Sequence, residues 1–284
     1  MGNHSKTVQK LDNPGAQPRR KNKFIQNVIK HPTLYIMAIP VIIYYIVFHY
    51  APMYGMVIAF QQFVPSKGIF GSQWVGLRHF QSFFSDVYFF RLVRNTLLIN
   101  IYQLIFGFPV PIIFALLLNE LRNIRFKKII QTITYMPHFI SAVVVCGIVI
   151  EFTKSNGVIT HFATMLGMSP GNMLGKPELF RSIFVAQNIW QQFGWGSIIF
   201  IASLSSIDPT LYEASTIDGA SRWKQVLHIT LPGIAPTIVI LLILRIGQLM
   251  SLGWEKIILL YSPLTYETAD VISTYVYRRG LIHI

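Results

Sequence analysis

Charged residues and cysteine are both scarce in this chain of 284 residues. Charged side chains make up 12% of it, whereas an ordinary soluble domain has about a quarter. Together with 52% hydrophobic residues and a mean hydropathy of +0.49, this scarcity predicts a membrane protein. Cys146 is the only cysteine, which excludes an intrachain disulfide and a multi-cysteine metal site. Its apolar surroundings predict a packing residue.

The sequence also lacks the patterns of an enzyme. It has no Gly-rich phosphate loop ending in Gly-Lys-Ser or Gly-Lys-Thr. Its eight histidines are scattered, without a His-Glu-x-x-His pair, and there is no nucleophile elbow. We therefore expect no catalytic residues, no metal site and no cofactor bound by this chain. Any ATP that drives it would be hydrolysed by another protein.

Long apolar runs are abundant instead. A helix needs about 20 mostly apolar residues to cross the hydrocarbon core of a bilayer. Suitable stretches run over about 34–60, 95–118, 129–150, 182–207 and 234–261. Buried core helices of a large soluble protein are an alternative, but such helices rarely exceed twenty residues without a charge. We predict five membrane spans.

Two apolar segments could be mistaken for something else. The first run could be a signal peptide, but it is far longer than a signal-peptide core and lacks a small-x-small cleavage site. We expect a retained span. The aromatic-rich stretch between Arg78 and Arg91 is too short to cross, and it favours an interfacial amphipathic helix.

The formal net charge of +13 is concentrated in two places. One is the basic tail, residues 1–30, and the other is the connection holding Arg122, Arg125, Lys127 and Lys128. The positive-inside rule puts both in the cytoplasm and argues against a nucleic-acid partner. The tail is a topology signal or, alternatively, attracts anionic membrane lipid. Alternation of five spans then places 61–94 and 151–181 outside, and 119–128 and 208–233 inside.

The polar segment 208–233 lies between two apolar runs and predicts two short helices at an angle. Asp208 can cap a first helix that begins with Pro209. Gly219 permits the backbone angle that ends it, and Ser221 can cap a second helix over 222–228. We expect Leu231-Pro232-Gly233 to close the motif.

Within this segment, Glu213 to Pro232 reads E-A-S-x-I-D-G-A-x-x-W-x-x-x-x-x-I-x-L-P. This spacing resembles the loop by which membrane subunits of binding-protein-dependent ABC importers engage their ATPases. The matching positions are Glu213, Ala214, Gly219, Ile229, Leu231 and Pro232; the departure is Ser215, where Ala is commoner. The resemblance implies that Glu213 faces the ATPase cleft and that Ala214 and Gly219 allow close approach. Trp223 would pack on the partner, and the same coupling loop holds Ser215, Asp218, Ala220, Leu231 and Pro232.

The resemblance further implies an all-α, polytopic helix bundle of the type I importer permease kind over residues 31–284. It would lie in a bacterial plasma membrane with its N-terminus in the cytoplasm. The implied partners are a second permease subunit forming a heterodimer, two ATPase subunits carrying ATP-Mg, and a solute-binding protein. That protein would dock on the outer segment 152–181, for which a solvated connector is the alternative. The resemblance implies a sixth span after the segment matching 273–280, so we expect the sequence ending at Ile284 to be incomplete; the alternative is that this subunit lacks that helix.

Polar side chains inside spans are costly and usually face a cavity or a partner helix. At helical spacing, the fourth predicted span carries Asn188, Gln191, Gln192 and Trp195, and the fifth carries Arg245, Gln248 and Glu255. We predict that these residues line the translocation path. Asn100 and Gln103, in the second predicted span, either line the translocation path as well or form hydrogen bonds between packed helices. A guanidinium at membrane depth, that of Arg245, needs water, an anionic partner or substrate.

Amides beside indole rings suit a sugar cargo, with Trp190, Trp195 or Trp254 covering its apolar faces or, alternatively, lying in an interfacial belt. The segments 94–96, 108–111, 136–139 and 266–277 resemble the carbohydrate branch of these permeases, which includes importers of polysaccharides and uronate oligosaccharides. An acidic oligosaccharide, such as an alginate or pectin fragment, would suit Arg245. The alternatives are a secondary transporter of a polar solute, an importer permease for a non-sugar solute, and a membrane sensor or scaffold.

Overall fold

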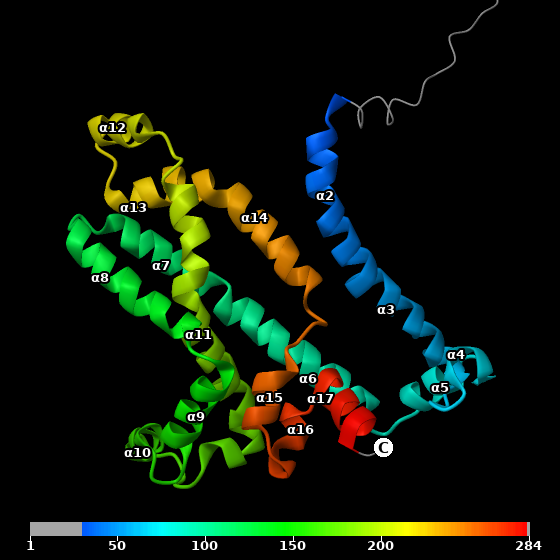
Figure 1. Cartoon of the computed structure of the whole chain (residues 1–284). Helices are drawn as coiled ribbons and strands as arrows, with labels where there is room; N and C mark the ends of the chain where they lie inside the picture. Colours follow the sequence, from blue (N-terminus) through cyan, green and yellow to red (C-terminus); the bar gives the residue numbers. More distant parts are fainter. Residues whose placement is uncertain (1–29, 283–284) are drawn as a thin grey trace, which may run out of the picture. The chain divides into compact units, whose positions relative to one another are not determined.

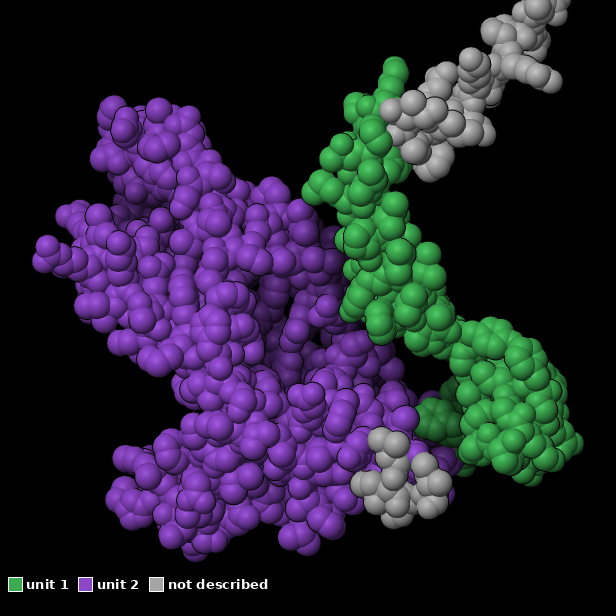
Figure 2. All heavy atoms as spheres, in the orientation of Figure 1, with its two compact units in different colours: residues 1–85 green, residues 86–284 purple. Residues whose placement is uncertain are grey.

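The computed structural model describes residues 30–282, and the chain divides into two units, residues 1–85 and 86–284 (Figure 2). Among the described residues, helices make up most of both units, and there is one two-stranded sheet. The predicted helical class is confirmed. Apart from Lys30, the predicted basic tail lies outside the described residues.

The first unit begins with an apolar helix that nothing in the described chain buries. It comprises α2 (Pro32–Tyr45), a π-helical turn (Ile46–Tyr50), α3 (Ala51–Met53) and a 3-10 segment (Tyr54–Phe60). Most of its large side chains are exposed, as lipid-facing side chains would be. The predicted first span is therefore a helix long enough to cross a membrane.

A small aromatic substructure follows in the same unit. Strands β1 (Gln61–Gln62) and β2 (Gln73–Trp74) pair antiparallel, with α4 (Gly68–Gly71) in their connection. The rings of Phe60 and Trp74 stack with centroids 5.7 Å apart. The predicted interfacial helix is α5 (Arg78–Phe84), which is only seven residues long.

The second unit is a bundle whose helices are, in chain order, α6 (Phe89–Tyr102), α7 (Pro109–Glu120), α8 (Ile124–Tyr135), α9 (Ala142–Thr153), α10 (Val158–Met165), α11 (Pro177–Leu204), α12 (Pro209–Ile217), α13 (Arg222–Gln225), α14 (Leu231–Gly247), α15 (Trp254–Leu260), α16 (Tyr266–Ala269) and α17 (Ile272–Tyr277). Helix α11 contacts α6, α7, α8, α14 and α16, so it is the centre of the bundle. Figure 1 places α12 and α13 at one end of this unit and α9, α10, α15 and α16 at the other.

Four helical stretches are long and apolar enough to span a membrane: Pro32–Phe60, Phe89–Glu120, Ala142–Met165 and Arg222–Gly247. Helix α11, the predicted fourth of five spans, has 28 residues. It is about 42 Å long at a rise of about 1.5 Å per residue, which is ample for a span. Its amide side chains lower its hydropathy, so it is not among the four most apolar stretches of the described residues.

Two predicted spans are wrong as single helices. The third, 129–150, is broken where Pro137 enters a 3-10 turn (Met136–Phe139) and Ser141 starts α9 by accepting from the Val144 amide at 3.4 Å. The fifth, 234–261, is broken between Gly247 and Trp254, where α14 ends and α15 begins. A lack of charge predicts burial in lipid but says nothing about continuity, which Pro, Ser and Gly decide.

Other prolines lie inside continuous helices. The π-helical turns Ile46–Tyr50, Gln103–Gly107 and Val226–Thr230 end two residues before Pro52, Pro109 and Pro232. Proline lacks an N–H and crowds the carbonyl four residues earlier, which in each case belongs to the π turn. The wider turn accommodates the proline without breaking the helix.

Buried apolar side chains of the second unit form two clusters. The cluster near α15 includes Ile99, Cys146, Phe180, Phe184 and Ile257. The cluster toward α12 contains Ile112, Ala115, Phe200, Leu204 and Ile234. Cys146 is 1% exposed, so its predicted role as a packing residue is confirmed.

A buried polar cluster joins α6 and α11 to the C-terminal segment. Asn95 donates from Nδ2 to the carbonyls of Glu267 and Asp270, both at 2.9 Å, and its Oδ1 accepts from Arg181 at 2.8 Å. The fully buried Asp270 carboxylate pairs with Arg278 at 2.6 Å. Burial of these polar groups is tolerated because they are partnered. Two segments that resemble the carbohydrate branch, 94–96 and 266–277, therefore contact each other.

Helices α8 and α11 cross closely at Gly194. A Cβ added there would lie 2.2 Å from the Thr134 carbonyl oxygen. We expect Gly194→Ala to force the helices apart and cost about 1–3 kcal/mol of stability, measured as a lower melting temperature of the purified protein. Gly147→Ala in α9 is the control, because its added Cβ meets nothing within 4 Å. Equal melting temperatures for Gly194→Ala and the control would contradict this prediction.

Candidate coupling loop and translocation path

Residues 208–233 begin with a short helix whose two ends are formed as predicted. Asp208 caps α12 by accepting from the Thr210 amide at 2.9 Å, and this bond lowers the pKa of the Asp208 carboxyl below its usual value. Gly219 adopts a φ of +74° in the turn after α12. Ser221 then caps α13, accepting from the Lys224 amide at 3.4 Å. This segment lies at one end of the second unit (Figure 1).

Side-chain hydrogen bonds attach α12 to the following helix. Gln225 Nε2 donates to Ser215 Oγ and to Thr216 Oγ1, both at 3.0 Å. The hydroxyl oxygens of Tyr212 and Thr230 lie 3.0 Å apart. Ser215, the departure from the family pattern, therefore supplies an acceptor that alanine lacks. The loop is held as one piece.

The second helix of the loop is longer than predicted. Helix α13 continues through the π turn Val226–Thr230 into α14, so the helix extends from Arg222 to Gly247. Leu231 and Pro232 lie inside this helix and do not close the loop. The prediction failed because the π turn accommodates Pro232, which would otherwise end the helix.

The surface of the loop is apolar in part and open to contact. Ile217 is 87% exposed and Trp223 is 73% exposed. Glu213, Ala214, Asp218 and Gly219 are exposed as well, while Ser215 and Ala220 are half-buried. Large exposed apolar side chains gathered on one surface indicate a site of protein contact.

An ion pair connects the loop to the end of α7. Arg222 Nη1 lies 3.6 Å from Glu120 Oε2. Glu120 is followed closely by the basic connection that holds Arg122, Arg125, Lys127 and Lys128. The loop and these basic residues therefore share one end of the unit (Figure 1).

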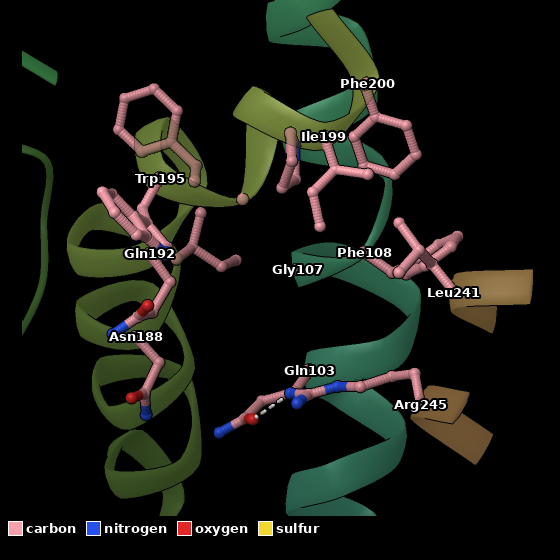
Figure 3. A pocket seen from close by; sticks show the side chains of 14 residues that line it. Gln103, Gly107, Phe108, Asn188, Gln192, Trp195, Ile199, Phe200, Leu241 and Arg245 are labelled. Carbon is pink, nitrogen blue, oxygen red and sulfur yellow. Dashed lines mark hydrogen bonds between the residues drawn. The ribbon is translucent and has the colours of Figure 1, made fainter. Parts of the chain in front are cut away.

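A cavity of about 430 Å³ lies between α11, α14 and the α6–α7 helix (Figure 3). Its polar side chains and its one indole are those of Gln103, Asn188, Gln192, Trp195 and Arg245. Apolar side chains such as Phe108 and Leu241 complete the wall. An apolar cavity with a few convergent polar groups is typical of a site for an organic molecule.

A second cavity, of about 300 Å³, adjoins the first. It shares the lining residues Gln103, Asn188 and Arg245 and adds Glu255 and Lys256 from α15. The non-helical segment between α14 and α15 forms part of the wall of this second cavity. The break in the predicted fifth span thus contributes to the wall of the site.

Two cations line these cavities, and both hydrogen-bond to amides. Arg245 Nη2 donates to Gln103 Oε1 at 2.8 Å (Figure 3). Lys256 Nζ donates to Asn188 Oδ1 at 2.8 Å and to Gln191 Oε1 at 2.6 Å. Both cationic residues are half-buried. The site therefore combines positive charge with neutral hydrogen-bonding groups.

Trp195 presents a fixed ring to the first cavity. Its indole stacks on the His138 imidazole, with ring centroids 4.5 Å apart and an interplanar angle of 1°. His138 Nδ1 lies 3.0 Å from Gln192 Oε1, which orients the imidazole. A flat aromatic surface beside amides is suited to a sugar ring.

The structure brings five of the seven predicted path residues to the two cavities: Asn188, Gln192, Trp195, Arg245 and Glu255. Gln191 is 3% exposed and lines neither cavity; it supports Lys256 and also donates to the Ile140 carbonyl at 3.0 Å. Gln248 lies beyond the end of α14, is exposed and lines neither cavity. Its helical spacing from Arg245 has no meaning because the helix ends at Gly247.

Sequence reasoning missed two residues of the site, His138 and Lys256. Lys256 stands next to Glu255 in a run read as one helix, so the pair indicated only the far end of a span. His138 follows Pro137, a sign of a break that brings a polar side chain toward α11. The helix breaks at Pro137 and at 248–253 were the sequence features that could have identified His138 and Lys256 as site residues.

Comparisons with known proteins agree with this architecture. Residues 107–280 match the family of binding-protein-dependent transport system inner membrane components. The polygalacturonan/rhamnogalacturonan transport system permease protein YteP of Bacillus subtilis (strain 168) is 44% identical over 263 residues, covering 92% of this chain and 82% of YteP.

Two solved structures are similar as well. One is of a bacterial ABC transporter involved in the import of the acidic polysaccharide alginate; it has 43% identity and a TM-score of 0.83, over 92% of this chain and 88% of that one. The other is of a bacterial alginate ABC transporter in complex with an alginate pentasaccharide-bound periplasmic protein. It has 42% identity and a TM-score of 0.82, over the same shares of both chains.

These similarities decide between the functional classes that the sequence left open. The match covers more than half of the chain and includes both the loop 208–233 and the cavity-lining helices α11 and α14. The family comprises transport permeases rather than catalytic enzymes, and this chain has several helices long and apolar enough to span a membrane. The chain belongs to the family of binding-protein-dependent transport system inner membrane components, the permease subunits of ABC importers.

Proposed function

We propose that this permease subunit imports an acidic oligosaccharide, such as an alginate or pectin fragment, and that an ATPase subunit docks on the loop 208–233. The observation that carries the proposal is a stiff, exposed loop continuous with the helix that places Arg245 in a cavity. The names of the similar proteins, which concern alginate and polygalacturonan, support the class of cargo.

The coupling step follows from the construction of the loop. Glu213, Ala214, Asp218 and Gly219 offer an exposed surface, and Trp223 adds an apolar contact. Because Gln225 ties α12 to α13, a partner that moves α12 also moves the helix Arg222–Gly247. Leu231 and Pro232 lie within that helix and transmit the displacement toward Arg245. Such rigid-body motion is a common means of switching between states.

The partners proposed from the family are a second, different permease subunit, two ATPase subunits and a solute-binding protein. ATP-Mg is bound by the ATPases and not by this chain. The basic residues Arg122, Arg125, Lys127 and Lys128 share the loop's end of the unit, which supports a cytoplasmic location for that end in a bacterial plasma membrane. The positive charge of the tail 1–30 supports a cytoplasmic N-terminus. The segment 152–181 belongs to the opposite end, where a solute-binding protein would dock. Alternating access between two permeases would carry the cargo inward.

The lining of the cavities supports an acidic sugar. Asn188 and Gln192 offer amides for hydroxyl groups, and Trp195 offers a flat apolar surface. Arg245 and Lys256 supply positive charge, against the single acidic side chain of Glu255 among the lining residues of the second cavity. A neutral sugar would use the amides but not the charge.

We expect Gly219→Val to uncouple the importer. A φ of +74° costs a residue with a Cβ roughly 1–2 kcal/mol, so α12 should be displaced from its docking position. Binding-protein-stimulated ATP hydrolysis by the reconstituted complex should fall about tenfold, while membrane insertion is unchanged. Glu213→Ala should reduce the same activity without altering the backbone.

Gly76→Val is the matched control for this change. Gly76 has a φ of +61° and an added Cβ there would meet nothing within 4 Å, so the variant carries comparable backbone strain outside both the loop 208–233 and the segment 152–181. Wild-type ATPase stimulation in both Gly219→Val and Glu213→Ala would contradict the proposed docking site. An equal loss in Gly76→Val would attribute the effect to general strain.

We expect Arg245→Gln to reduce transport of acidic cargo selectively. The substitution removes the positive charge from the cavity but keeps an N–H donor for Gln103. Hydrogen bonds to charged groups contribute about 1.5–3 kcal/mol, so uptake of an acidic oligosaccharide into vesicles should fall tenfold or more. Uptake of a neutral oligosaccharide should change little. Equal losses of uptake for both cargoes would contradict the proposal that the positive charge of Arg245 favours acidic cargo.

A further inference from the structure

Lys256 has contacts that neither the coupling loop nor the packing of the bundle explains. It lies on α15, just after the non-helical segment 248–253, and its side chain reaches back to α11. There its Nζ meets the side chains of Asn188 and Gln191. Of these three residues, Asn188 and Lys256 line the second cavity.

The ammonium of Lys256 is oriented without being neutralised. Its partners are two amide oxygens, at 2.8 and 2.6 Å, which accept hydrogen bonds but carry no net charge. In residues 30–282 the ion pairs are Arg91–Asp270, Lys154–Glu151, Arg222–Glu120 and Arg278–Asp270. Lys256 is in none of them, and neither is Arg245.

A half-buried ammonium without a counter-ion is costly, because desolvation is not repaid by an opposite charge. The neighbouring Glu255 lines the same cavity but lies beyond ion-pair distance of the ammonium. Two of the three N–H groups of Nζ are used by the amides. The third N–H and the whole positive charge remain for a ligand in the cavity.

We propose that Lys256 forms a carboxylate-binding subsite of the second cavity, with Asn188 and Gln191 holding its ammonium in place. The ligand is a carboxylate group of the cargo, as in a uronic acid residue. Arg245 lines the same cavity and provides a second cation. This inference rests on the proposed function, because it requires an acidic oligosaccharide as cargo.

The bonds to neutral amides distinguish this subsite from a structural ion pair. A carboxylate partner within the protein would cancel the charge and exclude a second carboxylate from the cavity. Asn188 and Gln191 instead fix the position of Nζ, so little conformational entropy of the lysine side chain is lost when an anion binds.

The test compares two cargoes that differ only in charge. One is a uronate oligosaccharide, and the other is the same oligosaccharide with its carboxyl groups reduced to primary alcohols. Binding of each is measured on the full importer complex in nanodiscs without its solute-binding protein, and uptake is then measured with that protein present. The variants are Lys256→Met and Lys256→Gln, the second of which keeps one donor for the amides.

We expect both variants to bind the acidic oligosaccharide about tenfold or more weakly, as expected for the loss of a charge-assisted hydrogen bond. Binding of the reduced oligosaccharide should change less than about twofold, because hydrogen bonds between neutral groups do not depend on the charge. Lys67→Met is the control, since it removes an exposed lysine that lies outside the segment 152–181 and lines neither cavity. It should leave both cargoes unaffected.

Equal weakening for both oligosaccharides, or no weakening, would overturn the subsite. Failure of both Lys256 variants to assemble would also overturn it, because the lysine would then serve the fold. A wild-type complex that neither binds nor imports the acidic oligosaccharide would contradict the proposed function itself. A wild-type complex that prefers the acidic cargo, with the same preference in both variants, would contradict this inference alone.

Discussion

A carboxylate without any exposure to solvent must be neutralised inside the protein, and Asp270 is such a group. Arg278 and Arg91 lie 2.6 and 3.7 Å from it, and its backbone carbonyl accepts from Asn95 on α6. Asn95 in turn accepts from Arg181 on α11. Two long helices and the C-terminal segment are thereby fixed to one another. The position of α15 between α14 and this segment, and so the approach of Lys256 to α11, depends on that arrangement.

The opposite end of the second unit is held by weaker interactions. Gln225, Ser215 and Thr216 are joined by hydrogen bonds between neutral groups, and the Arg222–Glu120 pair is solvent-exposed on both sides. The loop is therefore stiff within itself but lightly attached to its neighbours. A loop that a partner subunit displaces must be stiff within itself and weakly attached to its neighbours, whereas the end of the unit beside Asp270 must stay in place.

Much of this was predictable from the sequence, and the failures have common causes. Low charge predicted the membrane class, and the Asp208, Gly219 and Ser221 signals predicted the start and the turn of the loop. Helical spacing correctly put Asn188, Gln192 and Trp195 on one face of α11, because that helix is unbroken. Spacing failed for Gln248 because the helix ends one residue earlier. The break at 248–253, bounded by Gly247 and Gly253, and the π turn before Pro232 reflect single Gly and Pro residues, which hydrophobic periodicity does not report.

The two cations of the site belong to elements that are held differently. Arg245 is on α14, which is continuous with the coupling loop, while Lys256 is on α15, close to the segment fixed by Asp270. A displacement of the loop in the proposed importer would move Arg245 relative to Lys256, because the two residues lie on separate helices that the non-helical segment 248–253 joins. An anionic cargo that bridges both cations would be gripped at one separation and released at another. The broken fifth span, a failure of the sequence prediction, is the feature that makes such a change possible.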